Sequence, residues 1–350
     1  MSNFCPEDWE GVPEDFPHHD VYPWVSKLPK NKKIYCSFWC HWQSDDLKKG
    51  YDYYIVSFHT ENINYEWLVQ QEVDGKILVL FPGRSYDCKI PNVTLIGYTE
   101  LHNDLNKMIT WFGTNEISWN KKYKFSTICN RVTQGKIWTT TQILENNTDS
   151  LVIHNPDWIE DKNVHNWQKT GNAYLDNLTD IYRSKYIHLR LSDDFDHNRD
   201  NTQTVNSDPW QPYYTDTALH IVGGSFHYSY MNGFTYPGPD IDEKLLKCLL
   251  AGVAFIPAMQ YDVYDYLSEF GLVFDYKFDK SFDSDPGNLT RFEKICRLLD
   301  SLSQWSIDDI INATRHSTIH NQEHILSGAF AKECNAHNEQ QVDKLFAQLQ

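Results

Sequence analysis

The stretch SFHYSYMNGFTYPGPDIDEKLLKCLLAGVAFIPAMQYDVYDYLSEFG, residues 225–271, contains the pattern that decides the fold. Its middle part predicts a helix that ends at Gly252, because leucines recur at helical spacing and glycine commonly follows a helix end. These leucines are Leu245, Leu246, Leu249 and Leu250. The apolar run Ala254–Pro257 then predicts a short buried strand, and we expect a second helix to end at Gly271.

A helix, a buried strand and a helix in this order indicate part of a doubly wound α/β sheet. We expect the first helix to begin at Pro239 and Asp240, with Glu243 three residues after Asp240 in a capping-box arrangement. In such sheets ligands bind outside the carboxyl ends of the strands, and helix N-termini hold anions. The stretch is therefore the first place to look for a ligand site.

The rest of the chain extends this pattern in both directions. Before residue 119 we expect strands over residues 34–39, 53–58, 76–81 and 93–98, and helices over 65–72 and 99–112. After it we expect strands over 124–129, 151–153 and 218–222, and helices over 135–144, 288–303, 307–329 and 339–350. Residues 155–216 are polar and carry no clear pattern.

These elements predict an α/β protein with two facing Rossmann-like domains. We expect an N-terminal domain over residues 1–118, opened by an irregular arm, and a C-terminal domain over 119–335. A final helix over 336–350 is expected to pack back on the N-terminal domain.

Composition narrows the class of protein. The chain has 350 residues and a formal net charge of −17, which argues against a general nucleic-acid coat protein. The eight cysteines form no paired framework, so we expect reduced thiols. Because the sequence has no apolar segment at its start and no run of membrane-spanning length, we expect a cytoplasmic protein, a monomer or weak dimer.

The run Asp242–Lys247 followed by Ala254–Pro257 resembles the "TEK-x-x-K … PF-I" segment of a glycosyltransferase family of tailed phages and other large viruses. It is similar, more distantly, to the donor-binding segment of α-1,3-fucosyltransferases. The resemblance implies the glycosyltransferase-B architecture, with Glu243 at the ribose of a nucleotide-sugar and Lys244 at its diphosphate. Asp242 stands where the family usually has Thr. The alternative is structural: a capping Glu243, with Lys244 and Lys247 on a solvated helix face.

A second group of candidate donor-binding residues follows the strand expected at 124–129. Asn130 and Arg131 resemble the "N-R" start of the family's donor domain, and Lys136 follows at the entry to a helix. A diphosphate leaving group gains negative charge as the glycosidic bond breaks, and preorganised cations at a helix N-terminus stabilise that charge. Ser225, after the strand over 218–222, completes the set. The alternative is that Arg131 packs on the linker.

His59 and Glu61 are the candidate catalytic bases, because they follow the strand over 53–58 on the edge expected to face the other domain. Asp45 and Asp46 are the reserve candidates, and an exposed loop without function is the alternative reading.

Two further motifs receive no catalytic role. Residues 194–198, DFDHN, contain a DxD pattern and the start of a calcium loop, but Arg199 and Val205 replace the later ligands, so we interpret them as a polar loop. No metal site is predicted. The pair His320-Asn321 resembles an "H-N" pair near the family's C-terminus, and no function is assigned to it.

Lysines cluster before and after the first expected strand, at Lys30, Lys32, Lys33, Lys48 and Lys49. At the cleft mouth they would dock a polyanionic acceptor. Because phage enzymes glycosylate hydroxymethylated pyrimidines, the resemblance suggests 5-hydroxymethylcytosine in double-stranded DNA as the acceptor and a UDP- or GDP-sugar as the donor, without an essential divalent metal. The alternatives are a glycan or other hydroxyl acceptor, and a non-catalytic sugar- or nucleic-acid-binding protein with a degenerate fold of this type.

Overall fold

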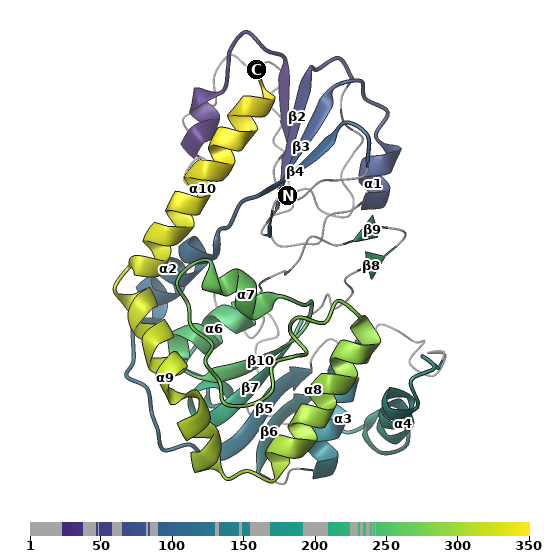
Figure 1. Ribbon diagram of the computed structural model, residues 1–350, viewed down its shortest axis with the longest axis vertical. Coiled ribbons are helices and arrows are strands. Elements are labelled where there is room, and N and C mark those ends of the chain that lie inside the picture. Colours follow the sequence, from purple (N-terminus) through teal and green to yellow (C-terminus); the bar gives the residue numbers. More distant parts are fainter. Residues whose placement is uncertain are drawn as a thin grey trace. The chain divides into compact units, whose positions relative to one another are not determined.

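The computed structural model describes residues 23–37, 47, 49–57, 65–81, 83–84, 90–129, 133–146, 149–154, 169–191, 209–224, 230–231, 234–235, 239, 241 and 243–350. These described residues belong to two compact units. The first lies within residues 1–103, 230–240 and 331–350, and the second within 104–229 and 241–330. Each unit contains one parallel sheet of four strands, so the fold is mixed α/β (Figure 1).

The first unit holds four parallel strands in chain order. They are β1 (Ile34–Ser37), β2 (Tyr53–Ser57), β3 (Lys76–Phe81) and β4 (Val93–Gly97), with the 3₁₀ helix η1 (Pro23–Lys27) before them and α1 (Tyr65–Gln70) between β2 and β3. Helix α2 (Leu101–Phe112) follows β4 and runs into the second unit. The four predicted strands are confirmed. Their apolar runs arise because a parallel sheet is buried on both faces.

Alternate residues of these strands point to the two faces of the first sheet. Tyr54 and Val56 belong to one apolar cluster, whereas Ile55 lies in the other, together with Leu345 and Leu349 from the C-terminal segment. Helix α10 (Ala329–Gln348) therefore covers one face of this sheet. It begins ten residues before the predicted helix, because the segment 329–338 has few apolar residues to reveal its period.

The second unit holds four parallel strands in the spatial order β6–β5–β7–β10 (Figure 1). Their bounds are β5 (Tyr123–Cys129), β6 (Ser150–His154), β7 (Thr217–Gly223) and β10 (Ala254–Ala258). The chain passes from β5 outward to β6, and then returns across β5 to β7. The direction of winding thus reverses between β5 and β7, which is the topological switch point of a doubly wound sheet.

Two groups of helices accompany the second sheet. Helix α3 (Gln134–Asn146) contacts α4 (Ala173–Ile181) and α8 (Asn288–Ser303), whereas α6 (Glu243–Ala251) contacts α5 (Pro212–Thr215) and α9 (Ile307–Leu326). The π-helical turn η4 (Tyr182–Tyr186) continues α4, and α7 (Val263–Ser268) follows β10.

The two ends of α6 show where the sequence pattern was right and where it was not. Gly252 has a φ of +61°, and its N–H donates to the Leu249 carbonyl while the Val253 N–H donates to the Cys248 carbonyl. This Schellman motif confirms the predicted helix end. The predicted start is wrong: α6 begins at Glu243, so this residue is the first of the helix and not the third helical residue that a capping box requires.

The polar segment 155–216 contains short elements that its composition did not reveal. Asn172 caps α4 by accepting from the Tyr174 and Leu175 N–H groups, both at 3.1 Å. The buried side chains here are both aliphatic and aromatic: Leu175 and Leu178 of α4 are buried, and so is Tyr182. Helices of four and nine residues are too short for an apolar period to stand out in a polar segment, which is why these helices were missed. A further unpredicted hairpin, β8 (Tyr230–Met231) and β9 (Phe234–Thr235), belongs to the first unit.

Candidate functional site: the carboxyl edge of the second sheet

Strands β5 and β7 end side by side at the switch point. Thr127 pairs with Ile221, two residues before the last residue of each strand, so Cys129 and Gly223 mark the same edge. A crevice at this position is where open α/β sheets bind their ligands. The connection after β5 leads into α3, and the connection after β7 leads to α6.

Lys136 extends across this edge. Its side chain is 4% exposed and passes over Gly223: a Cβ atom on Gly223 would lie 2.9 Å from the Lys136 Cγ and 3.3 Å from its Cε. Only a residue without a side chain permits this approach. The glycine at the end of β7 therefore exists to let a buried lysine lie over the strand end.

The position of Lys136 on its helix is electrostatically unfavourable. Thr133 caps α3 and its Oγ1 accepts from the Lys136 N–H at 3.5 Å, which makes Lys136 the third helical residue. Carboxylates are favoured there, because the helix macrodipole is positive at this end, and burial adds a desolvation cost to the ammonium. A bound anion relieves both effects.

The second candidate group opens α6. The Lys244 Nζ lies 2.8 Å from the Glu243 Oε1, and the two side chains are 8% and 18% exposed. Lys247, one turn further, is fully buried. In parallel β–α–β units each helix begins at the carboxyl edge of the preceding strand. Lys136 and the Glu243–Lys244 pair therefore belong to the same edge of the sheet.

Other residues proposed from the sequence lie outside the described residues. These are His59 and Glu61, the reserve pair Asp45 and Asp46, the donor candidates Asn130, Arg131, Ser225 and Asp242, the docking candidate Lys48, and the DFDHN segment. Their roles stay predictions.

The described docking lysines do not lie at a carboxyl edge. Lys30, Lys32 and Lys33 precede β1, and Lys49 precedes β2. Because β1 and β2 are parallel, these residues occupy the amino edge of the first sheet. This edge is opposite to the one at which ligands of open α/β sheets bind. Their expected position at the mouth of a cleft stays a prediction.

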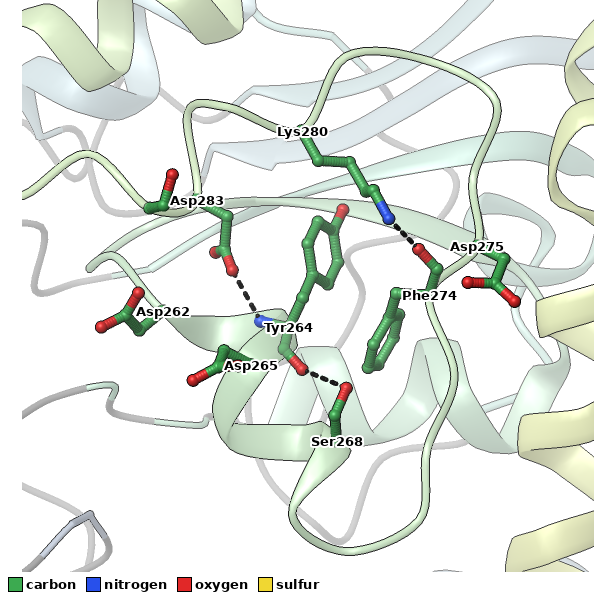
Figure 2. A pocket seen from close by; sticks show the side chains of 9 residues that line it. Asp262, Tyr264, Asp265, Ser268, Phe274, Asp275, Lys280 and Asp283 are labelled. Carbon is green, nitrogen blue, oxygen red and sulfur yellow. Dashed lines mark hydrogen bonds between the residues drawn. The ribbon is translucent and has the colours of Figure 1, made fainter.

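A pocket near the carboxyl end of β10 was not foreseen (Figure 2). Its volume is about 360 Å³, and it is lined by Asp262, Tyr264, Asp265, Ser268, Phe274, Asp275, Lys280, Asp283 and Ser284. Asp283 caps α7 by accepting from the Val263 N–H at 3.0 Å and the Tyr264 N–H at 2.9 Å. Burial raises the pKa of Asp283 to about 6. Lys280 donates to the Phe274 carbonyl across the pocket.

The wall of this pocket is held by α9. Asn321 clamps one residue of the extended segment, since its Oδ1 accepts from the Val273 N–H at 2.7 Å and its Nδ2 donates to the Val273 carbonyl at 2.9 Å. The His320 Nε2 lies 3.1 Å from the Gly271 carbonyl oxygen. The His320-Asn321 pair, which had no role in the sequence analysis, thus fixes the segment that follows α7.

No group of three or more His, Cys, Asp and Glu side chains in the described ranges is arranged to hold a metal ion. The five cysteines that the structure describes are buried and are not joined in disulfides: Cys36, Cys129, Cys248, Cys296 and Cys334. No described helix combines the length and the apolar character needed to cross a bilayer.

The comparisons with known proteins add no relative. No protein-family model matches the chain, and no curated protein is similar enough to count as a match. What can be said of the site therefore rests on its geometry: a doubly wound sheet, a buried lysine over a glycine at the switch point, and a buried ion pair at the start of the next helix.

The Lys136–Gly223 contact was only half visible in the sequence. Lys136 was selected because it enters a helix, and the signal that could have located its partner is the Gly223-Gly224 pair at the end of the strand expected at 218–222. A glycine at a strand end indicates that another group approaches the backbone closely, but the sequence does not identify the group.

Proposed function

We propose that this protein is a glycosyltransferase that moves a sugar from a nucleoside-diphosphate sugar to an acceptor hydroxyl, with its two α/β units in the glycosyltransferase-B arrangement. The observation that carries the proposal is the Lys136 side chain over Gly223 at the switch point of the second sheet. The resemblance of residues 242–257 to the donor segment of the viral and phage enzymes gives the ligand its chemical class.

In the proposed reaction the bond between the anomeric carbon and the diphosphate oxygen breaks, and a new bond forms between the same carbon and the acceptor oxygen. The leaving diphosphate gains one negative charge. Lys136 and the N-terminus of α3 would stabilise that charge, since both are positive and already in place before the reaction. The acceptor proton would pass to Glu61 or His59. Glu243 and Lys244 would hold the ribose and the second phosphate.

A second candidate function is favoured by one observation. Lys244 already has a carboxylate partner, Glu243, at 2.8 Å, and both side chains are mostly buried. A pair satisfied in this way fits a protein that recognises a sugar or nucleic acid without chemistry, because Glu243 neutralises the charge that Lys244 would offer to a transition state. Turnover separates the two functions.

The test is a direct assay of transfer. DNA containing 5-hydroxymethylcytosine is incubated with the protein and a set of UDP- and GDP-sugars, released nucleoside diphosphate is followed, and the nucleosides are analysed by mass spectrometry. A nucleoside heavier by one sugar supports the proposal and identifies the acceptor. Released diphosphate with unmodified DNA supports a glycosyltransferase with another acceptor. Neither product with any donor contradicts the proposal and favours the binding protein.

The first prediction concerns Lys136. Lys136→Met keeps most of the aliphatic stem over Gly223 but removes the charge, so the rate of diphosphate release should fall by about two to three orders of magnitude. Lys124→Met is the matched control, because Lys124 is bound at the other end of β5, where its Nζ donates to the Ser303 carbonyl at 2.7 Å. Equal rates in the Lys136 variant and the wild type would remove Lys136 from the site.

A further inference from the structure

The segment from η1 to the start of β1 exposes a group of lysines that the acidic chain does not neutralise. Lys27, Lys30, Lys32 and Lys33 lie within seven residues, and none of them has an ion pair in the part of the chain that the structure describes. By contrast, Lys49 and Lys122 are paired, with Glu72 at 3.4 Å and with Asp216 at 2.6 Å. We name residues 27, 30, 32 and 33 the amino-edge lysines.

The chain has 48 acidic residues and only 31 basic ones, so a group of lysines close together in sequence stands out. Some exposed lysines of the described residues have a carboxylate partner, such as Lys185 and Lys294, which lie 2.9 and 2.6 Å from Glu145 and Asp285. Others, such as Lys277 and Lys332, have none among these described residues, so what distinguishes the amino-edge lysines is that four of them lie within seven residues. Four neighbouring ammonium groups without such partners form a local positive surface, the electrostatic feature that attracts a polyanion.

The backbone beneath these lysines is fixed. Trp24 and Leu28 are buried against the first sheet on either side of Lys27. The Lys32 N–H donates to the Pro29 carbonyl at 3.3 Å, and the Lys33 carbonyl accepts from the Asp52 N–H at 2.9 Å and from the Tyr53 N–H at 3.2 Å. The positive groups are therefore presented from an ordered turn, and binding would cost little backbone entropy.

Two carboxylates at the same edge, Asp52 and Glu72, are already engaged, whereas the exposed Asp74 before β3 has no ion pair in the described residues. The Asp52 Oδ2 accepts from the Lys33 N–H at 3.2 Å, so this carboxylate is directed to the backbone. Glu72 binds Lys49. The Nζ of Lys32 lies 5.7 Å from the centroid of the Tyr53 ring, a cation–π contact that leaves its positive charge in place.

We propose that the amino-edge lysines dock the phosphate backbone of double-stranded nucleic acid. A lipid surface is the less fitting occupant, because stable membrane binding combines basic residues with inserted apolar side chains. The exposed large apolar residues in the described part of the chain are Val69, Trp111 and Leu326, and none of them is in this segment. Lysines that neutralise the phosphates of a duplex need no such insertion.

The position of the amino-edge lysines sets the distance between the docked phosphates and the carboxyl edge of the first sheet. β3 has six residues, so the amino edge of the first sheet is about 17 Å from its carboxyl edge at 3.3 Å per residue. A duplex that runs along the sheet crosses this distance in about five base pairs at about 3.4 Å each. A base presented at the carboxyl edge would therefore be held through phosphates about five base pairs away.

This inference does not depend on the proposed glycosyl transfer, and its test needs no donor. Binding of the full chain to a fluorescent duplex of about 20 base pairs is measured by anisotropy between about 50 and 200 mM salt. The wild type is compared with the triple variant Lys27→Ala, Lys30→Ala, Lys33→Ala. The control triple variant is Lys122→Ala, Lys185→Ala, Lys294→Ala, which removes the same charge from paired lysines of the second unit.

With four phosphates contacted, the slope of log K against log salt should be about −3.6, and affinity should fall about 150-fold over this salt range. The amino-edge triple variant should reduce the slope to about −0.9, whereas the control should keep the slope of the wild type. Equal slopes in all three proteins would overturn the proposal. So would binding of the wild type to vesicles containing phosphatidylserine without any binding to the duplex. A docking surface that fails this test leaves the transfer assay unaffected, and the converse also holds.

Discussion

Replacing Gly223 by alanine tests the feature on which the site depends. The new Cβ would lie 2.9 Å from the Lys136 Cγ, 3.3 Å from its Cε and 3.4 Å from its Cδ. A separation below 3.0 Å from a carbon near the base of the side chain cannot be relieved by moving the ammonium end alone. The lysine must change rotamer or β7 must shift, and overpacking of this kind costs about 1–3 kcal/mol.

A double-mutant cycle isolates the contact. Gly223→Ala alone should lower the free energy of unfolding by about 1–3 kcal/mol, measured by urea denaturation. In the background of Lys136→Ala the clash disappears, so the same substitution should cost less than about 0.5 kcal/mol. The interaction energy between the two positions should therefore be about 1–2 kcal/mol.

The outcome that would refute this reasoning is additivity. If Gly223→Ala costs the same with and without the Lys136 side chain, within about 0.5 kcal/mol, the lysine does not lie over the glycine in solution. A functional readout accompanies the cycle: Gly223→Ala should also slow diphosphate release, because it moves the ammonium group while leaving its charge.

Two further predictions concern stability. Burial raises the pKa of Asp283 from 3.8 to about 6, so between these pH values the native state binds more protons than the unfolded chain. The free energy of unfolding therefore falls as pH rises through this window, by up to about 3 kcal/mol from this carboxyl group. Denaturation of Asp283→Asn and of the wild type at each pH should show the difference in unfolding free energy shifting in favour of the variant from pH 4 to pH 6. A difference independent of pH would contradict the raised pKa of Asp283. Gly252→Ala should destabilise the protein by about 2–4 kcal/mol in thermal unfolding, because φ is +61° and a Cβ would lie 2.4 Å from the Ile117 Cγ1. The control Gly113→Ala has a φ of +73° with open space around it, so it should cost only about 1 kcal/mol. Equal costs at the two glycines would show that Ile117 does not approach Gly252.

The regular elements were predictable because their signals are local. The strand Lys76–Phe81 and the helix Asn288–Ser303 have the bounds that the sequence predicts, since each is a continuous run with a strong apolar pattern between turn residues. Gly252 marked its helix end for the same reason: a left-handed residue is a property of one position.

The candidate site was predictable only in part. Position at the entry to a helix after a strand selected Lys136, whereas the Glu243-Lys244 pair was selected through the resemblance of its segment to a donor-binding segment. The lysines before β1 were predicted to dock an acceptor, and the structure adds that they lie at the amino edge of their sheet. A charge cluster in a sequence indicates a surface but not which end of a sheet carries it.

The sequence by itself determined the eight strands of the two parallel sheets and the helix end at Gly252, because periodicity and backbone conformation are properties of neighbouring residues. Only the tertiary structure decided the strand order β6–β5–β7–β10, which creates the switch point, and the contact of Lys136 with Gly223. It also decided the clamp of Asn321 on Val273, 48 residues away. These features depend on which segments meet after folding, and no local pattern encodes the distance between residues that are far apart in the chain.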